Sequence, residues 1–229
     1  MPTIAIVGAG PGLGLAIART FGAQGFDVAL ISRSQDTVDH LVEKLAADGI
    51  VAAGFPADVR DRPALTRALA DATARFGRID VLEFSPVAKE AGGTTLVRPT
   101  DLTPEDVQPE IEAQLYGAIA ATRAVLPGMR ETGSGTLLFT TGAGSVDPVP
   151  EVGNVNAAAA ALRNWAVNLN KELEGSGVYA AHVAIDVSID VAVIPGFPTA
   201  PASEIALAYW DLHTKRQDRE FVFSIRPRS

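Results

Sequence analysis

Short runs of apolar and β-branched residues alternate along the chain with longer stretches that have the apolar periodicity of helices. The short runs predict strands, and the longer stretches predict helices. The expected strands are Thr3–Val7, Asp27–Ile31, Val51–Phe55, Val81–Phe84, Thr136–Thr140, Val178–Ile185 and Glu220–Phe223. The expected helices are Gly12–Gln24, Gln35–Asp48, Arg62–Phe76, Pro104–Glu131, Asn154–Glu174 and Ala202–His213. This alternation is typical of a Rossmann-type, doubly wound α/β fold, a mostly parallel seven-stranded sheet with helices on both faces.

The length and composition favour one folded unit. With 229 residues, of which 47% are hydrophobic, the chain can bury one large core and is short for two. We therefore expect a single domain over residues 1–229. The formal net charge of -8 argues against nucleic acid as a partner, because binding a phosphate backbone requires a clustered cationic surface. The expected partners are a small-molecule substrate and other protein chains.

The sequence offers few groups for metal binding or membrane insertion. It has no cysteine, and its three histidines are too scattered for metal ligation, so no metal site is expected. The N-terminal segment lacks a basic region and leads directly into a glycine-rich turn, which argues against a signal peptide. No later stretch reaches the roughly 20 apolar residues of a membrane span. We expect a soluble protein of the cytoplasm.

The most specific motif is a glycine-rich turn between the first expected strand and the first expected helix. Residues without a Cβ atom allow a tight turn and a close approach to a pyrophosphate, and the N–H groups and helix dipole favour its negative charge. Its position is that of the dinucleotide-binding fingerprint, whereas the alternative is an ordinary glycine-rich loop. The residues expected to bind are Gly8, Gly10, Gly12, Leu13 and Gly14.

The end of the second expected strand indicates which dinucleotide binds. Ser32 and Arg33 stand there, with no carboxylate to accept a hydrogen bond from a ribose 2′-hydroxyl. A hydroxyl and a guanidinium instead suit a 2′-phosphate, so NADP(H) is expected in preference to NAD(H). The alternative is that Arg33 is an ordinary surface arginine.

These residues resemble the short-chain dehydrogenase/reductase family over nearly the whole chain. The glycine spacing matches the family's cofactor motif, and the segment with Asp58 and Val59 is similar to the one that follows the family's third strand and contacts the adenine. The family's Asn-Asn-Ala-Gly after the fourth strand is replaced here by a segment containing Ser85 and Pro86. The resemblance implies that all four residues contact the dinucleotide.

The residues that carry the family's usual chemistry are missing. The resemblance places Gln114 where the family has an asparagine, Gly142 at its serine, Val155 at its tyrosine and Ala159 at its lysine. No shift of register restores the acid–base pair, because residues 148–165 contain neither tyrosine nor lysine. Valine and alanine cannot transfer protons, so the usual pair is absent.

Other polar residues near the expected carboxyl ends of the strands are candidates for chemistry. Tyr116 and Gln114 on the long helix, and Thr141 and Ser145 after the fifth strand, are the candidates that we select as catalytic. The alternatives are a core aromatic for the tyrosine and backbone capping for the hydroxyls. His182 is expected to be a satisfied core histidine. Further polar candidates at the same edge are Glu83, Lys89, Thr140, Asp186, Ser188 and Asp190.

Two functions from different classes follow. The first is an NADP(H)-dependent reductase of a small carbonyl or similar electrophile, in which water or a displaced group supplies the proton. The second is a redox-neutral enzyme or a non-catalytic cofactor-binding scaffold that reuses the fold. The resemblance also implies a homodimer or homotetramer that assembles through the helices at 104–131 and 154–174. The proline- and glycine-rich stretch at 194–201 is expected to be a loop over the site.

Overall fold

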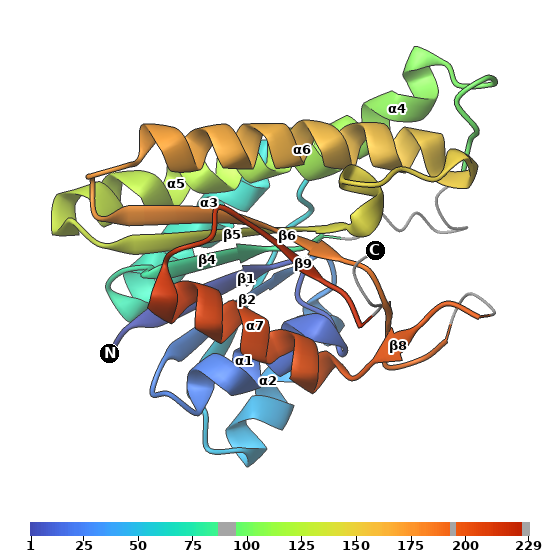
Figure 1. Ribbon diagram of the computed structural model, residues 1–229. Helices are drawn as coiled ribbons and strands as arrows, with labels where there is room; N and C mark the ends of the chain where they lie inside the picture. The colour runs from blue at the N-terminus through green and yellow to red at the C-terminus, as the bar shows by residue number, and fades with distance from the viewer. Residues whose placement is uncertain (87–94, 193–195, 226–229) are drawn as a thin grey trace.

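A seven-stranded sheet forms the centre of the computed structural model, which describes residues 1–86, 95–192 and 196–225 (Figure 1). The strand order is β3-β2-β1-β4-β5-β6-β9, and every neighbouring pair is parallel. The strands are β1 (Thr3–Val7), β2 (Asp27–Ser32), β3 (Ala52–Pro56), β4 (Val81–Phe84), β5 (Gly135–Gly142), β6 (Val178–Ile185) and β9 (Glu220–Phe223). The predicted Rossmann-type sheet is confirmed.

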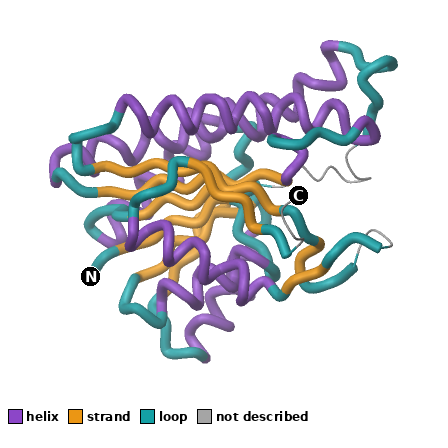
Figure 2. Tube along the Cα trace, in the orientation of Figure 1, coloured by secondary structure: helices purple, strands orange, loops and turns teal. Residues whose placement is uncertain are grey.

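Helices cover both faces of this sheet, which explains why its strands are apolar on both sides (Figure 2). One layer contains α1 (Leu13–Gly22), α2 (Gln35–Ala47) and α7 (Ala202–Lys215). The other contains α3 (Arg62–Phe76), α5 (Gly117–Thr132) and α6 (Gly153–Glu172). Among the helices of the described residues, none combines the length and apolar character that a membrane crossing requires.

Local capping sets where several helices begin. The side chain of Asp61 accepts from the N–H of Ala64 at the start of α3. Thr103 and Asp106 form a reciprocal capping box at the start of α4 (Pro104–Ile111). An N-cap oxygen satisfies N–H groups that have no partner within the helix, so both starts follow from the local sequence.

The region predicted as one helix at 104–131 is interrupted. After α4 the chain passes through a π-helical turn, η1 (Glu112–Tyr116), before α5 begins at Gly117. A π-helical turn shifts the side chains that follow it around the helix axis, and such turns are frequent at functional sites. The prediction of a single uninterrupted helix was wrong. The apolar periodicity of a long segment is nearly unchanged when one turn contains an extra residue.

The first helix and the loop near the C-terminus also differ from expectation. Helix α1 begins at Leu13 and ends at Gly22, inside the predicted bounds of 12–24. Part of the predicted loop at 194–201 is a strand, β8 (Thr199–Ala200), which pairs in parallel with β7 (Ser188–Ile189). Residues 193–195 lie outside the described residues. Figure 1 shows α4 and β8 beyond the same end of the sheet.

The topology places an opening at the carboxyl end of β1. The chain proceeds from β1 to β2 and β3 on one side, and β4 then pairs with the other side of β1. In parallel α/β sheets this reversal of strand order leaves a crevice at which ligands bind. The N–H of Gly8 donates to Ile31 of β2, and the N–H of Ser85 donates to Val7 of β1. These bonds bring the ends of three strands together.

Candidate functional site

The glycine-rich turn after β1 has a backbone path that other residues would block. Gly8 has a φ of +95°, and a Cβ atom there would lie 2.6 Å from the Cα atom of Pro86. At Gly14 a Cβ atom would lie 3.1 Å from the Cα atom of Ala9. The N–H groups of Gly8 and Ala9 both donate to the carbonyl of Ile31, which fixes the turn against β2. Glycine is therefore required at position 8, where the turn passes β4, and position 14 leaves little room for a side chain where α1 packs against the turn.

The start of α1 suits an anion. Gly12 is the N-cap residue and has no side chain that could accept from the first N–H groups of the helix. The N–H groups of a first helical turn lack intrahelical partners, and together with the helix dipole they attract negative charge. A phosphate group fits this position without any cationic side chain.

Two cavities meet at the glycine turn. The wide cavity has a volume of about 720 Å³ and extends along the carboxyl ends of β4, β5 and β6 to α6. The narrow cavity has a volume of about 220 Å³ and extends over the ends of β2 and β3. Gly8, Gly10 and Pro86 line both cavities, so the two cavities adjoin at the glycine turn and are together called the groove. Every residue expected to contact a dinucleotide lines one or both: Gly8, Gly10, Gly12, Leu13, Gly14, Ser32, Arg33, Asp58, Val59, Ser85 and Pro86.

The narrow cavity is basic at its far end. It is lined by Ser32, Arg33 and also Arg60. Asp58 accepts from the N–H of Arg60 at 2.9 Å, and the two side chains form an ion pair at 3.6 Å. Arg60 is a lining residue that was not predicted from the sequence. The pairing of Ser32 with Pro56 brings the segment after β3 beside the end of β2, so an arginine four residues after β3 was the available signal.

The wide cavity contains the positions at which the family's catalytic residues were expected. Gly142, Val155 and Ala159 all line it, so the positions that the resemblance assigns to the serine and to the acid–base pair belong to this cavity. Gln114 lines it too, and its side-chain amide donates to Glu110 at 3.1 Å. The π-helical turn that contains Gln114 therefore faces the predicted site.

The charge of the wide cavity is negative among the described residues. Two carboxylates, Glu110 and Asp190, line it, and no lysine, arginine or histidine of the described chain does so. Asp190 has a φ of 61°, and its side chain accepts from the N–H of Ala202 at the start of α7. Lys89, a candidate in this region, lies outside the described residues. No three His, Asp or Glu side chains converge as a metal site would require in the described part of the chain.

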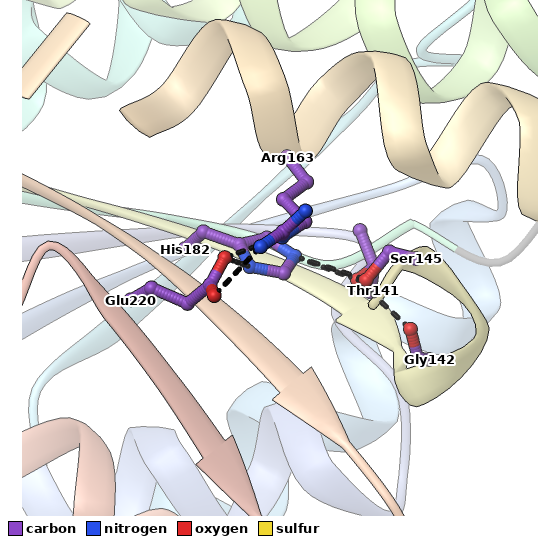
Figure 3. Close-up of polar contacts among 6 residues, drawn as sticks. All are labelled: Thr141, Gly142, Ser145, Arg163, His182 and Glu220. Atoms are coloured by element: carbon purple, nitrogen blue, oxygen red, sulfur yellow. Dashed lines mark hydrogen bonds and ion pairs between the residues drawn. The ribbon is translucent and has the colours of Figure 1, made fainter. Parts of the chain in front are cut away.

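Thr141 connects the wide cavity to a buried histidine on the α6 face of the sheet (Figure 3). Its Oγ1 atom lies 2.8 Å from Nε2 of His182 and 2.9 Å from Oγ of Ser145. Ser145 is buried and contacts Thr141, but it does not itself line the wide cavity. The structure thus brings the two predicted hydroxyl candidates together, and of the two only Thr141 lines the wide cavity.

His182 is fully buried and uncharged at neutral pH. Burial lowers its pKa to about 4, although the nearby carboxylate of Glu220 acts in the opposite direction. The Nδ1 atom lies 3.4 Å from Glu220 Oε2 without the geometry of a hydrogen bond, and Arg163 holds that carboxylate through two hydrogen bonds. The core position predicted for His182 is confirmed, whereas only one of its ring nitrogens is satisfied.

Thr140 precedes Thr141 in β5 and contacts a buried carboxyl group on the opposite face of the sheet. Its Oγ1 atom lies 2.8 Å from Glu83 Oε1 and 2.8 Å from the hydroxyl of Tyr209. The other oxygen of Glu83 accepts from Ser85 at 2.9 Å. Glu83 is fully buried, and burial raises its pKa to about 8, despite the two hydrogen bonds that act to lower it. The sequence places Glu83 at the end of a strand but does not show that the strand buries it.

The remaining catalytic candidate, Tyr116, lies elsewhere. It is 38% exposed and lines a separate cavity, where the guanidinium of Arg62 lies 5.6 Å from the centre of its ring. Tyr116 therefore does not reach the wide cavity from the long helix, whereas the hydroxyl of Tyr209 on α7 lies 2.8 Å from Thr140, which lines that cavity. Periodicity cannot show this, since the two tyrosines are brought to the sheet by different helices.

Comparisons with known proteins agree with this architecture. The family model described as short chain dehydrogenase matches residues 2–188. A protein assigned as ketoacyl reductase of the monensin polyketide synthase of Streptomyces virginiae is 33% identical over 201 residues, which are 87% of this chain and 71% of that protein. Ketoacyl reductase HetN of Nostoc sp. is 30% identical over 176 residues, which are 77% of this chain and 60% of that protein. A crystal structure of an actinorhodin polyketide ketoreductase variant with NADPH superposes with a TM-score of 0.84 at 22% identity, over 98% of this chain and 95% of that one. The chain belongs to the short chain dehydrogenase family.

Proposed function

We propose that this protein is an NADP(H)-dependent reductase of small, uncharged carbonyl compounds or similar electrophiles, working without the family's usual tyrosine and lysine. The observation that carries the proposal is this groove, in which the glycine turn adjoins a narrow cavity lined by Arg33 and Arg60 on one side and the wide cavity on the other. Related proteins with reductase names, and a solved structure with NADPH, support it.

The groove residues fit the parts of the dinucleotide in order. The N–H groups around Gly12 and Leu13 would hold the pyrophosphate, and Asp58 with Val59 would contact the adenosine. Arg33, Ser32 and Arg60 would surround a 2′-phosphate; guanidinium groups suit this dianion. Ser85 and Pro86 would lie beside the nicotinamide, at the junction with the wide cavity. When bound, the reduced cofactor supplies a hydride.

The wide cavity favours a substrate without negative charge. Its described lining is largely apolar, with the carboxylates of Glu110 and Asp190 and no cationic side chain. An anionic substrate would lose hydration and meet like charge there. Gln114 and Thr141 offer hydrogen bonds for a carbonyl oxygen, and Ser145 would position Thr141. A catalytic part for Tyr116 is not included, because its side chain lines another cavity.

Fluorescence titration with NADPH and NADH tests the cofactor assignment, and NADPH oxidation with a panel of activated carbonyls tests the reaction. We expect NADPH to bind more tightly than NADH, and an uncharged ketone to react faster than its carboxylate analogue. Failure of both dinucleotides to bind would overturn the proposal. Tight binding of NADPH with no acceptor oxidising it would instead favour the second candidate.

The second candidate is a redox-neutral enzyme or a cofactor-binding scaffold. The observation in its favour is that Val155 and Ala159 line the cavity where the family has its acid–base pair. Fold alone does not specify function, so loss of these groups is compatible with a changed activity. A structure with NADPH bound and its nicotinamide covered by protein would support the scaffold.

Assembly into a homodimer or homotetramer through α5 and α6 stays a prediction. Both helices lie on the same face of the sheet (Figure 1). The mass of the protein in solution, measured by light scattering over a range of concentrations, checks this prediction directly. A monomer at all concentrations would contradict it.

A further inference from the structure

The reduction proposed above requires a proton for the carbonyl oxygen, and the family's donor is absent. We propose that Glu83 stores this proton and that the hydroxyl of Ser85 delivers it into the wide cavity. The inference rests on the proposed function and names the proton source of that same site. Glu83 acts through Ser85 and does not touch the substrate itself, since Ser85 lines the cavity and Glu83 does not.

The first support is the path of hydrogen bonds. It runs from the buried phenol of Tyr209 through Thr140 to one oxygen of Glu83, and from the other oxygen to Ser85. Thr140 and Ser85 both line the wide cavity and are only partly buried, whereas Glu83 and Tyr209 are fully buried. A buried carboxyl group therefore has two hydroxyl contacts at the cavity wall.

The second support is a count of hydrogens. When Glu83 is ionised, each of its oxygens accepts one bond, from Ser85 and from Thr140. When Glu83 carries a proton, one oxygen must donate, and donation to Ser85 frees the Ser85 hydrogen to point towards a ligand. This exchange leaves the bonds of Thr140 to Glu83 and to Tyr209 in place. The protonated form thus converts Ser85 into a donor towards the cavity.

The surroundings keep Glu83 protonated at neutral pH. Strands β1 and β5 place the apolar residues Ile6 and Leu138 in register with it, and α7 contributes Tyr209 as the titratable group that faces it. Burial raises the pKa of Glu83 to about 8, and the pKa of Tyr209 is raised well above its ordinary value by burial and by the charge of Glu83. The phenol stays neutral, so Glu83 is the group that can release a proton near neutral pH.

The transfers balance. The carbonyl carbon gains a hydride with its electron pair from the reduced nicotinamide, which is thereby oxidised, and the carbonyl π bond opens towards oxygen. The oxygen takes the proton of Ser85 as the new O–H bond forms, and Ser85 takes the proton of Glu83. The resulting carboxylate accepts from Ser85 and Thr140, whose hydroxyl oxygens lie 2.9 Å and 2.8 Å from its two oxygens. Water that enters the cavity after product release returns a proton through Ser85.

Glu83→Gln tests the proposal, because glutamine can still accept from Thr140 and donate to Ser85 but cannot release a proton. With NADPH and an uncharged α-diketone, we expect kcat to fall by at least about 100-fold, which is the size of a general-acid contribution. The affinity for NADPH should not change. Wild-type kcat should fall above pH of about 8, as Glu83 loses its proton, and Glu83→Gln should lack this limb. Glu204→Gln, an exposed change in α7, is the matched control.

A measurement without cofactor separates the proton from the activity. Infrared difference spectra of the wild-type protein should contain the C=O stretch of a protonated carboxyl group at pH 7, lost as the pH rises through about 8 and absent from Glu83→Gln. The Ser85→Ala variant should keep this infrared band but lose activity. If Glu83→Gln does not fold, Ser85→Ala serves as the test variant in its place.

Three outcomes would overturn the inference, and a fourth would overturn the proposed function on which it rests. An ionised Glu83 at pH 7 overturns the inference, and so does a Ser85→Ala variant with wild-type kcat. A Glu83→Gln variant with wild-type kcat and the same pH limb does the same. A wild-type protein that binds NADPH but reduces no carbonyl overturns the proposed function instead, whatever the infrared band shows.

Discussion

Thr140 and Thr141 are neighbours in β5, yet they lead to different buried clusters on the two faces of the sheet. Thr140 contacts Glu83 and Tyr209 on the face covered by α7, while Thr141 contacts His182 on the face covered by α6. Successive side chains of a strand point to opposite faces, so this separation follows from the strand itself. Both hydroxyls line the same wide cavity.

The two clusters show that burial decides the charge of each titratable group. Burial disfavours the charged form of either type, so Glu83 keeps its proton and His182 loses its proton. The carboxylate of Glu220 does not reverse this for His182, because Arg163 already neutralises it. At neutral pH the Thr140 cluster can give a proton, whereas the histidine of the Thr141 cluster stays neutral and, with a pKa of about 4, is a weak base.

The strongest test of this comparison is to remove one serine hydroxyl from each cluster. Ser85→Ala should lower kcat roughly 100- to 1,000-fold because it interrupts the delivery of a proton. Ser145→Ala should lower it only by about threefold, since Ser145 contacts Thr141 from behind and is not itself a proton source. Steady-state kinetics with NADPH and an uncharged ketone give both values. Equal losses would mean that the clusters do not differ in function.

The free energy of unfolding should decrease at high pH as Glu83 loses its proton. The pKa of Glu83 is raised above the value of about 4.5 expected when unfolded, so its contribution is complete below that value and is lost as the pH rises through about 8. Glu83→Gln should therefore gain about 3 kcal/mol relative to wild type between pH 5 and pH 9. Urea unfolding at each pH measures this gain. A constant difference between the two proteins would show that Glu83 does not titrate in this range.

The contribution of His182 to stability should change with pH in the opposite direction and be lost at low pH. Its pKa is lowered from 6.5 to about 4, so its contribution is present above pH 6.5 and is lost as the pH falls through 4. His182→Gln should lose less stability than wild type from pH 7 to pH 4, by about 2 kcal/mol. His213 has a pKa lowered in the same way and remains in the variant, so part of the acid-side loss persists. NMR titration of the His182 ring checks the assignment, and a pKa near 6.5 would contradict it.

A substitution in the narrow cavity should alter the chemistry of the two clusters least. Arg33→Asp should weaken NADPH binding by about tenfold and NADH binding less, because only NADPH carries the 2′-phosphate. The pH dependence of kcat should stay that of wild type, since Arg33 lines the narrow cavity and not the wide one. Fluorescence titration with the two nucleotides gives the ratio. Equal weakening of NADPH and NADH binding would mean that Arg33 does not contact the 2′-phosphate. Arg60→Asp would then test whether the other arginine of the narrow cavity does so.

Much of the architecture was predictable because it depends on local patterns. The period of the apolar residues placed all seven strands of the main sheet, and Asp61 and Thr103 marked two helix starts through their capping oxygens. The π-helical turn and the β7–β8 pair were missed. The first changes the helical period by a single residue, and the second joins two very short segments that are separated along the chain.

The site was predictable where it depends on the backbone and less so where it depends on burial. The glycine turn and Arg33 follow a strand, and strand ends meet at one edge of a parallel sheet. Arg60 and Tyr209 were missed, and Tyr116 was placed at the wrong cavity, because helices and loops rotate side chains in ways that periodicity does not specify.

The amino-acid sequence alone determined that residues 148–165, where the resemblance expects a tyrosine and a lysine, contain neither, and that the first turn is built from glycines. Only the tertiary structure decided which group can replace them. Glu83 becomes a proton donor because strands and helices distant in sequence exclude water from it and leave Ser85 and Thr140 as its contacts. A pKa depends on desolvation and on distances between groups, and neither exists before the chain folds.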